Sequence, residues 1–159
     1  MSPEPATTPV LIGVPELAER LRAAEPLVLA DVRWTLNGPP GRPEFEAGHL
    51  PGAQWVDLEH ELSGPPHTGT GGRHPLPEPE AFQAVLRAAG VDDDVPVVAY
   101  DGATSLYAAR VWWLLTDAGH RDVRVLDGGY AGWVAAGLPV PALEVSLKLS
   151  ALGQFLPQD

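Results

Sequence analysis

Residues 95–119 read VPVVAYDGATSLYAARVWWLLTDAG and carry the clearest structural pattern in the chain. The apolar run 95–100 is typical of a strand that is buried on both faces of a parallel sheet. The short polar segment 101–105 predicts a tight connection, and the apolar spacing of 106–118 predicts a helix that ends at Gly119. A buried strand that leads directly into a helix is the repeating unit of an α/β fold.

The same alternation continues on both sides of this unit. Further strands are predicted at 27–30, 54–57 and 123–126, and further helices at 15–24, 78–90 and 130–136. The glycines and prolines of 35–43 predict an absence of regular structure, and those of 63–77 predict a long surface loop. The fold class is therefore α/β, with a central, mostly parallel sheet flanked by helices.

The length of 159 residues fits a single domain. We expect a flexible lead-in at 1–9, the folded domain at 10–140 and a linker-like tail at 141–159. The tail is apolar for a free segment, and we expect it either to dock on the domain or to mediate self-association. Its apolar residues are Leu147, Leu149, Leu152, Phe155 and Leu156.

Composition excludes several classes of function. The net charge of −11, from 21 acidic and 10 basic residues, disfavours nucleic acid and anionic membranes as partners. No apolar run approaches the roughly 18 residues of a membrane-spanning helix, and the start lacks a signal-peptide pattern, so a cytoplasmic location is expected. The cysteine count is zero, which removes disulfides, thiolate metal sites, iron–sulfur clusters and cysteine catalysis. The five histidines lack metal-ligand spacing, so we expect neither a metal nor a cofactor.

The connection after Tyr100 is the best candidate for a functional site. Ligands of parallel sheets gather beyond the carboxyl ends of the strands, and the amides at the start of the next helix favour an anion. A nucleophile at Asp101 would have its anionic form stabilised there. An aspartate in this place is also an ordinary cap of the helix. The candidate loop consists of Asp101, Gly102, Ala103, Thr104 and Ser105.

Three arginines are candidate anion contacts, and each has a structural alternative. Arg33 and Arg73 either reach an anion or neutralise nearby acidic groups. Arg110 lies early in the predicted helix and either positions an anion or pairs with Asp31 or Asp101.

Several motifs occur in register along the chain. They are DVRW at 31–34, GHLPGA at 48–53, GRHPLP at 72–77, VVAYD at 97–101, ARVWWLL at 109–115, GH at 119–120, VLDGG at 125–129 and Trp133. Over residues 10–140 the sequence resembles the rhodanese family, specifically the N-terminal half of two-domain thiosulfate or 3-mercaptopyruvate sulfurtransferases.

This resemblance implies a rhodanese fold and a specific division of labour. In the active half of such enzymes, a loop cysteine attacks a sulfane sulfur and carries it as a persulfide. The N-terminal half has an aspartate at that position, which here is Asp101. A carboxylate cannot form and release a sulfur–sulfur bond, so this chain alone is not expected to transfer sulfur.

The resemblance also implies a partner. Trp34, Leu106 and Tyr107 match positions that line a pocket shared with a Cys-containing rhodanese domain, which makes them pocket-wall residues. Without that partner, Trp34 and Tyr107 are expected to be exposed, and a homodimer could form through them.

Two other functions stay open at this stage. A stand-alone, non-catalytic binding or regulatory module has the same residues and differs only in whether a second domain follows Asp159. An aspartate-based phosphotransferase is the minor alternative, because carboxylates accept phosphoryl groups. Such enzymes usually carry a second acid two residues further on, where this chain has Ala103.

Overall fold

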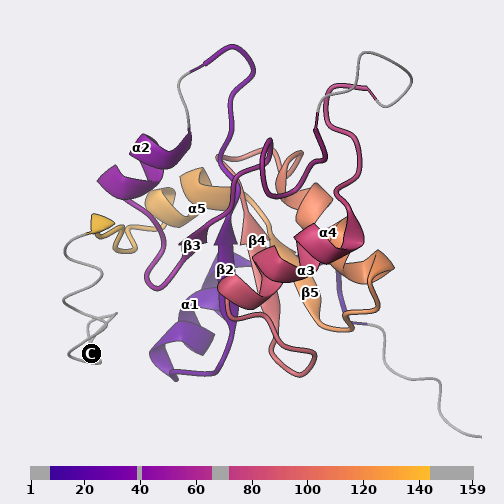
Figure 1. Cartoon of the computed structure of the whole chain (residues 1–159). Helices are drawn as coiled ribbons and strands as arrows, with labels where there is room; N and C mark the ends of the chain where they lie inside the picture. The colour runs from indigo at the N-terminus through magenta and orange to yellow at the C-terminus, as the bar shows by residue number, and fades with distance from the viewer. Residues whose placement is uncertain (1–7, 39–40, 66–71, 144–159) are drawn as a thin grey trace, which may run out of the picture.

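The computed structural model describes residues 8–38, 41–65 and 72–143 (Figure 1). Their five strands form one sheet in the order β1-β5-β4-β2-β3, and all four pairings are parallel. The strands are β1 (Leu11–Ile12), β2 (Val28–Asp31), β3 (Gln54–Trp55), β4 (Val97–Tyr100) and β5 (Val123–Leu126). The helices are α1 (Val14–Arg22), α2 (Gly41–Ala47), α3 (Pro79–Ala88), α4 (Ala108–Asp117) and α5 (Gly129–Ala135). The predicted α/β class and parallel sheet are confirmed.

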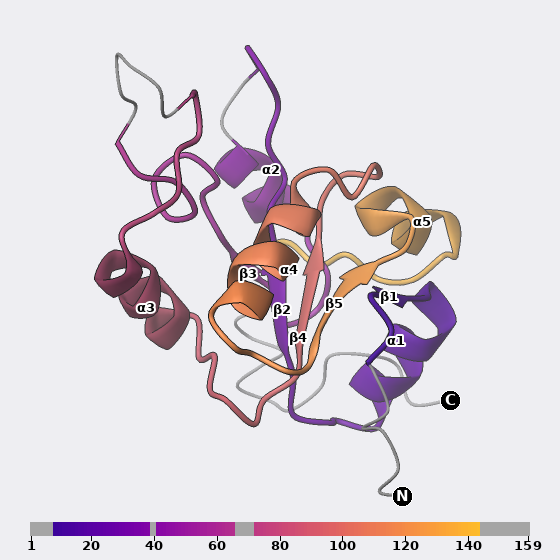
Figure 2. The same cartoon turned by 90° about the vertical axis from the view of Figure 1, so that its right-hand side faces the viewer.

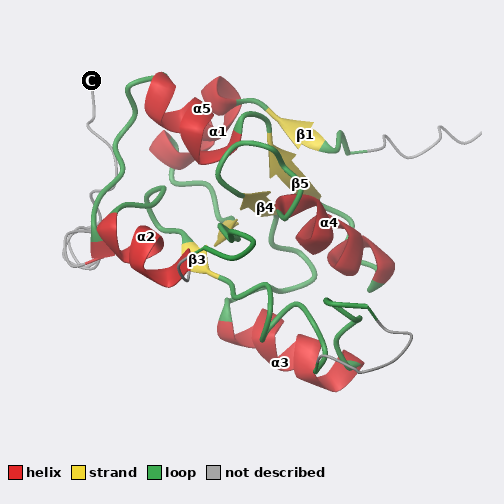
Figure 3. Cartoon of the chain, turned by 90° about the horizontal axis from the view of Figure 1, so that it is seen from above, coloured by secondary structure: helices red, strands yellow, loops and turns green. Residues whose placement is uncertain are grey.

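Helices cover both faces of the sheet (Figures 2 and 3). The helices α3 and α4 lie on one face, and α1, α2 and α5 lie on the other. Because all strands are parallel, their carboxyl ends meet at one edge, which is uppermost in Figure 1. The central strand β4 pairs Tyr100 with Asp31 of β2, so the two strands end side by side and the chain leaves them at residues 101 and 32.

The core consists of two clusters divided by the sheet. Along β4, Val97 and Ala99 point into the cluster under α3 and α4, whereas Val98 and Tyr100 point into the cluster on the opposite face. This alternation follows from the two-residue period of a strand. The first cluster is closed by Phe82, Val111, Leu114 and Leu115, and the second by Leu17, Phe45 and Trp133. Burial on both faces explains why the strands read as continuous apolar runs.

One prediction about regular structure is wrong. Residues 35–43 were expected to lack it, yet α2 begins at Gly41. A Cβ at this position would collide with the carbonyl oxygen of Arg33, so glycine is what lets the start of the helix pass so close to that backbone. Pro43 lies in the first turn, where its missing N–H has no intrahelical partner to lose.

The predicted lead-in and tail are only partly within the described residues. At the end of the lead-in, the Pro9 carbonyl accepts a hydrogen bond of 3.1 Å from Arg124 Nε. At the start of the tail, Leu143 packs against the cluster that contains Trp133, and His49 N donates to the Pro141 carbonyl at 3.2 Å. The apolar residues 147–156 lie outside the described part. Across the part that is described, no helix has the length and apolar character to span a membrane.

Candidate functional site

The side chain of Asp101 is enclosed by the loop that it begins. Its Oδ1 accepts hydrogen bonds from the amides of Ala103 (3.1 Å) and Ser105 (3.0 Å). Its Oδ2 accepts from the amides of Tyr107 (3.0 Å) and Ala108 (3.2 Å), where α4 begins. With four charge-assisted bonds, this carboxylate is an anion held at the amino end of a helix.

The same loop is supported from behind by α5. The amide of Tyr130 donates to the Asp101 carbonyl at 2.8 Å, and the amide of Ala131 donates to the Gly102 carbonyl at 2.9 Å. Gly129 has a φ of 56°, and a Cβ there would lie 2.6 Å from the Asp101 carbonyl oxygen. The loop is therefore fixed on one side by its own carboxylate and on the other by the start of α5.

This arrangement shows that Asp101 acts as a cap of α4. The residue is only 1% exposed and both carboxylate oxygens have donors. By contrast, Gly102, Ala103 and Thr104 are exposed, and Leu106 is 67% exposed. The loop therefore presents backbone and an apolar side chain outward while its charge points inward.

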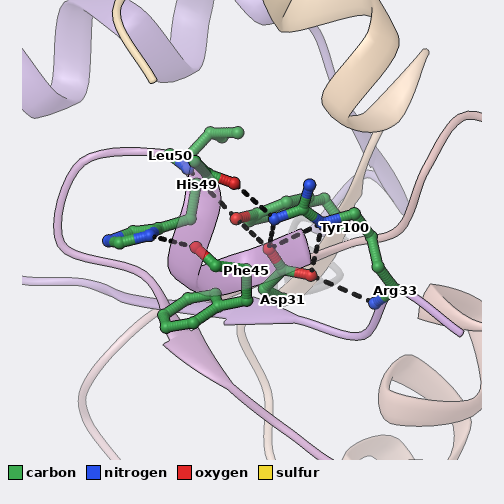
Figure 4. A network of polar contacts seen from close by, with 7 residues as sticks. Asp31, Arg33, Phe45, His49, Leu50 and Tyr100 are labelled. Carbon is green, nitrogen blue, oxygen red and sulfur yellow. Dashed lines mark hydrogen bonds and ion pairs between the residues drawn. The ribbon is translucent and has the colours of Figure 1, made fainter. Parts of the chain in front are cut away.

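A second buried network lies beside this loop (Figure 4). Asp31 is fully buried at the end of β2 and accepts hydrogen bonds from Arg33 Nη2 (2.8 Å) and from the Tyr100 hydroxyl (2.6 Å). Arg33 also donates to the Gly48 carbonyl at 2.6 Å, and the Leu50 amide donates to the Tyr100 hydroxyl at 3.1 Å. The network ties β2, β4 and the segment 48–50 together.

The Tyr100 hydroxyl keeps its proton and Arg33 keeps its charge at neutral pH. Burial, and then the neighbouring charge of Asp31, raise the pKa of Tyr100 well above its usual value. Burial lowers the pKa of Arg33, but its hydrogen bonds and ion pair with Asp31 outweigh this effect, so the pKa is raised. The guanidinium also lies 4.1 Å from the ring centre of Tyr130. The guanidinium of Arg33 is therefore engaged by Asp31, Gly48 and Tyr130 in the interior, and it is not directed at the Asp101 loop as an anion contact.

Arg110 also has a structural position. It donates from Nε to the Leu62 carbonyl (2.9 Å) and from Nη2 to the carbonyls of His74 (3.0 Å) and Pro75 (2.9 Å). The predicted pairing with a strand-end aspartate is wrong, because these bonds fasten the long loop before α3 to α4. Burial lowers the pKa of Arg110.

Aromatic rings form a wall next to the Asp101 loop. The ring centres of Trp34 and Tyr107 lie 5.2 Å apart, and the ring centre of His74 also lies 5.2 Å from that of Trp34. Of the three predicted wall residues, Leu106 is exposed, but Trp34 and Tyr107 are half-buried, so the expectation that these two are exposed is wrong. Arg73 is exposed with its guanidinium carbon 5.6 Å from the Trp34 ring centre.

His74 packs against Trp34 beside the candidate site and was not among the residues that the sequence singled out. Its Nε2 is buried and has no hydrogen-bond partner among the described residues, and Glu59 Oε1 lies 3.8 Å away. The only signal in the sequence was its place in the GRHPLP motif. Within residues 8–38, 41–65 and 72–143, no group of three or more acidic or histidine side chains is placed to hold a metal ion.

The fold and the loop together define a class of protein. It is an α/β domain with an all-parallel sheet, in which a buried strand delivers an anionic group to the amides of the next helix. Residues 14–136 match the family described as "Rhodanese-like domain", and the chain belongs to this family.

Curated relatives of the chain are named as sulfurtransferases. "Putative thiosulfate sulfurtransferase SseB" of Mycobacterium tuberculosis is 48% identical over 141 residues, which cover 88% of this chain and 49% of that protein. "Probable 3-mercaptopyruvate sulfurtransferase" of Pseudomonas aeruginosa is 45% identical over 140 residues, with coverages of 87% and 49%. The chain therefore spans about half the length of these relatives.

Solved structures of sulfurtransferases also match this chain. The crystal structure of SseA from Escherichia coli, described as a 3-mercaptopyruvate sulfotransferase, matches with a TM-score of 0.72 and 31% identity. The match covers 85% of this chain and 52% of that one. A 3-mercaptopyruvate sulfurtransferase from Leishmania major matches with a TM-score of 0.75 and 26% identity, with coverages of 89% and 38%. The chain is thus a rhodanese-like domain related to thiosulfate and 3-mercaptopyruvate sulfurtransferases.

Proposed function

We propose that this chain is the non-catalytic domain of a two-domain thiosulfate or 3-mercaptopyruvate sulfurtransferase, with Asp101 at the position of the catalytic cysteine. The observation that carries the proposal is the Asp101 carboxylate held by four loop amides. A thiolate or persulfide at the head of the same loop would need the same donors. The carboxylate therefore stands where the active half of the enzyme would carry its sulfur anion.

Sulfur transfer by this chain alone is chemically excluded on this proposal. The reaction requires a thiolate that forms and releases a sulfur–sulfur bond, and the sequence contains no cysteine. The role left to the domain is structural: it supplies one wall of a pocket whose reactive group belongs to its partner.

The surface around the loop supports this role. Leu106 is largely exposed beside the half-buried pair of Trp34 and Tyr107, and Arg73 adds a positive charge over the Trp34 ring. An exposed apolar side chain with aromatic and cationic neighbours is typical of an interface centre. We infer that this surface faces a Cys-containing rhodanese domain. A homodimer through the same surface is the alternative occupant.

The geometry counts against the phosphotransferase. In a phosphotransferase a carboxylate oxygen attacks phosphorus, whereas each oxygen of Asp101 already accepts hydrogen bonds from two amides. A stand-alone binding module would use the same surface. It differs from the half of a two-domain enzyme only in the partner that this surface contacts.

Mass spectrometry after incubation with thiosulfate tests the assignment of Asp101. In Asp101→Cys, the loop thiolate attacks the sulfane sulfur, the sulfur–sulfur bond of thiosulfate breaks, and sulfite leaves. We expect this variant to gain the mass of one sulfur atom and the wild-type chain to gain none. Asp94→Cys is the matched control, because Asp94 is exposed and lies outside the loop. Sulfur loading of the wild type, or equal loading of both variants, would overturn the proposal.

A separate experiment tests the partner. The chain is mixed with a separately produced Cys-containing rhodanese domain from a two-domain relative, and the transfer of sulfur from thiosulfate to cyanide is followed. We expect the chain to raise the rate and Leu106→Asp to remove most of that increase. Val134→Asp, which introduces the same charge at another exposed apolar position, is expected to have no effect. An unchanged rate with the wild-type chain favours the stand-alone module instead.

A further inference from the structure

The helices α3 and α4 lie on the same face of the sheet (Figure 2). Residues of both helices line a groove between them. Its volume is about 710 Å³. It reaches Asp117 at the end of α4 and His120 just beyond, so it lies away from the Asp101 loop, which opens the other end of that helix. The site described above does not use it.

The groove has an apolar floor and exposed apolar walls. Phe82 and Leu114 belong to the buried core and form part of the floor. On the walls, Trp113 remains 45% exposed and Leu76 remains 59% exposed. A tryptophan costs free energy when it is left in water, and exposed aromatic side chains are enriched where proteins bind other proteins.

The rim of the groove is acidic. Four exposed carboxylates line it, contributed by Glu80, Asp92, Asp93 and Asp117. The basic side chains in the lining are Arg87 and His120. His120 Nε2 lies 3.0 Å from the Val95 carbonyl, so that nitrogen faces the backbone. With four carboxylates against the one guanidinium of Arg87, the rim carries a net negative charge around an apolar centre.

We propose that this groove binds a segment of another protein in which a lysine or arginine stands next to an apolar side chain. The apolar side chain would enter between α3 and α4 and cover the floor. The cation would lie over the exposed indole of Trp113, where a cation–π contact and the carboxylate of Asp117 act together.

The negative charge of the rim favours this basic segment over a second copy of the chain and over an anionic lipid surface. A second copy of the chain would bring the same four carboxylates against themselves, because a two-fold interface places equal surfaces together. An anionic lipid surface would be repelled for the same reason. The proposal is independent of sulfur chemistry and of the partner at the Asp101 loop.

Titration of the ¹⁵N-labelled chain with the peptide acetyl-Lys-Leu-Arg-Leu-Lys-amide tests the proposal. We expect a dissociation constant below about 1 mM and chemical-shift changes centred on the Trp113 indole and the amides of α3 and α4. The peptide acetyl-Glu-Leu-Glu-Leu-Glu-amide has the opposite charge and is expected not to bind. No binding of the basic peptide, or shifts centred elsewhere, would overturn the proposal.

Charge variants separate the groove from general attraction to an acidic protein. Asp93→Lys with Asp117→Lys should weaken binding by about tenfold or more. The matched control is Glu19→Lys with Glu25→Lys, at exposed positions on α1 and just after it, which produces the same change in net charge. Equal weakening by both pairs would contradict the proposal. So would sedimentation that shows a dimer dissociated by Trp113→Ala.

Discussion

Replacement of Asp101 by asparagine removes a charge and almost no volume, so it isolates the electrostatic part of the loop. The carboxylate accepts from four amides, two at each oxygen. An asparagine has a single acceptor oxygen, and its NH₂ group must face two of these N–H donors. Two amides therefore lose their bonds whichever way the side chain is turned.

The cost depends on which pair of amides is lost. The amide of Ala108 is buried, whereas those of Ala103 and Ser105 are less so. We expect the asparagine oxygen to face Tyr107 and Ala108, and the other pair to turn partly to water. A hydrogen bond to a charged group contributes about 1.5–3 kcal/mol, and an unsatisfied buried donor costs about 1–3 kcal/mol. The free energy of unfolding should fall by about 2–4 kcal/mol, a large part of the roughly 5–15 kcal/mol of a typical domain.

Urea unfolding followed by tryptophan fluorescence measures this change, since Trp133 is fully buried and becomes exposed on unfolding. The matched control is Asp94→Asn, an exposed position at which the same change should alter stability by less than about 0.5 kcal/mol. An Asp101→Asn variant as stable as this control would refute the view that the carboxylate holds the loop.

Three further changes test the surrounding structure, each by urea unfolding. Tyr100→Phe removes a hydroxyl that donates to a buried carboxylate and accepts from a backbone amide, and should cost about 1–3 kcal/mol; no loss would mean that the network relaxes freely. Gly129→Ala should cost clearly more than Gly137→Ala, since both have positive φ but only the first places a Cβ against the Asp101 carbonyl; equal costs would contradict this. Burial lowers the pKa of His49 in the folded chain, so as the pH falls through 6.5 the imidazole of the unfolded chain takes up a proton first and stability declines below that pH. The variant His49→Gln should remove this part of the decline, and an unchanged pH profile of stability would contradict the prediction.

The fold was largely predictable because its strands are buried on both faces. The predicted strand 123–126 coincides with β5, and the predicted helix 78–90 contains α3. Apolar periodicity predicts an element well when the same side of it is buried along its whole length. The prediction failed at α2, where it rested on a different rule. That rule, that glycine and proline break helices, is only statistical. The close approach of Gly41 to the backbone of Arg33 is a tertiary contact that no local rule includes.

The position of the candidate site could be predicted from the sequence, but the hydrogen-bond partners of its residues could not. Sequence pointed to the loop after Tyr100 and left Asp101 undecided between a cap and a nucleophile. The two roles differ only in which atoms surround the carboxylate. Likewise, the sequence left Arg110 open between an anion contact and a pairing with an acid, but its partners are backbone carbonyls. Every residue carries a carbonyl, so side-chain identity holds no information about such partners.

The loop also explains why an acid suits a domain without a cysteine. Four N–H groups converge on one point at the amino end of α4, and their positive ends repel one another unless an anion lies between them. On the function proposed above, a sulfur anion fills this point in the catalytic domain, and a domain without cysteine has none to offer. A neutral side chain at 101 would leave the amides to water or to a chance anion, and the loop would lose its shape. A buried carboxylate maintains that shape permanently, so the wall formed by Tyr107 and Leu106 stays in place whether or not a ligand is bound.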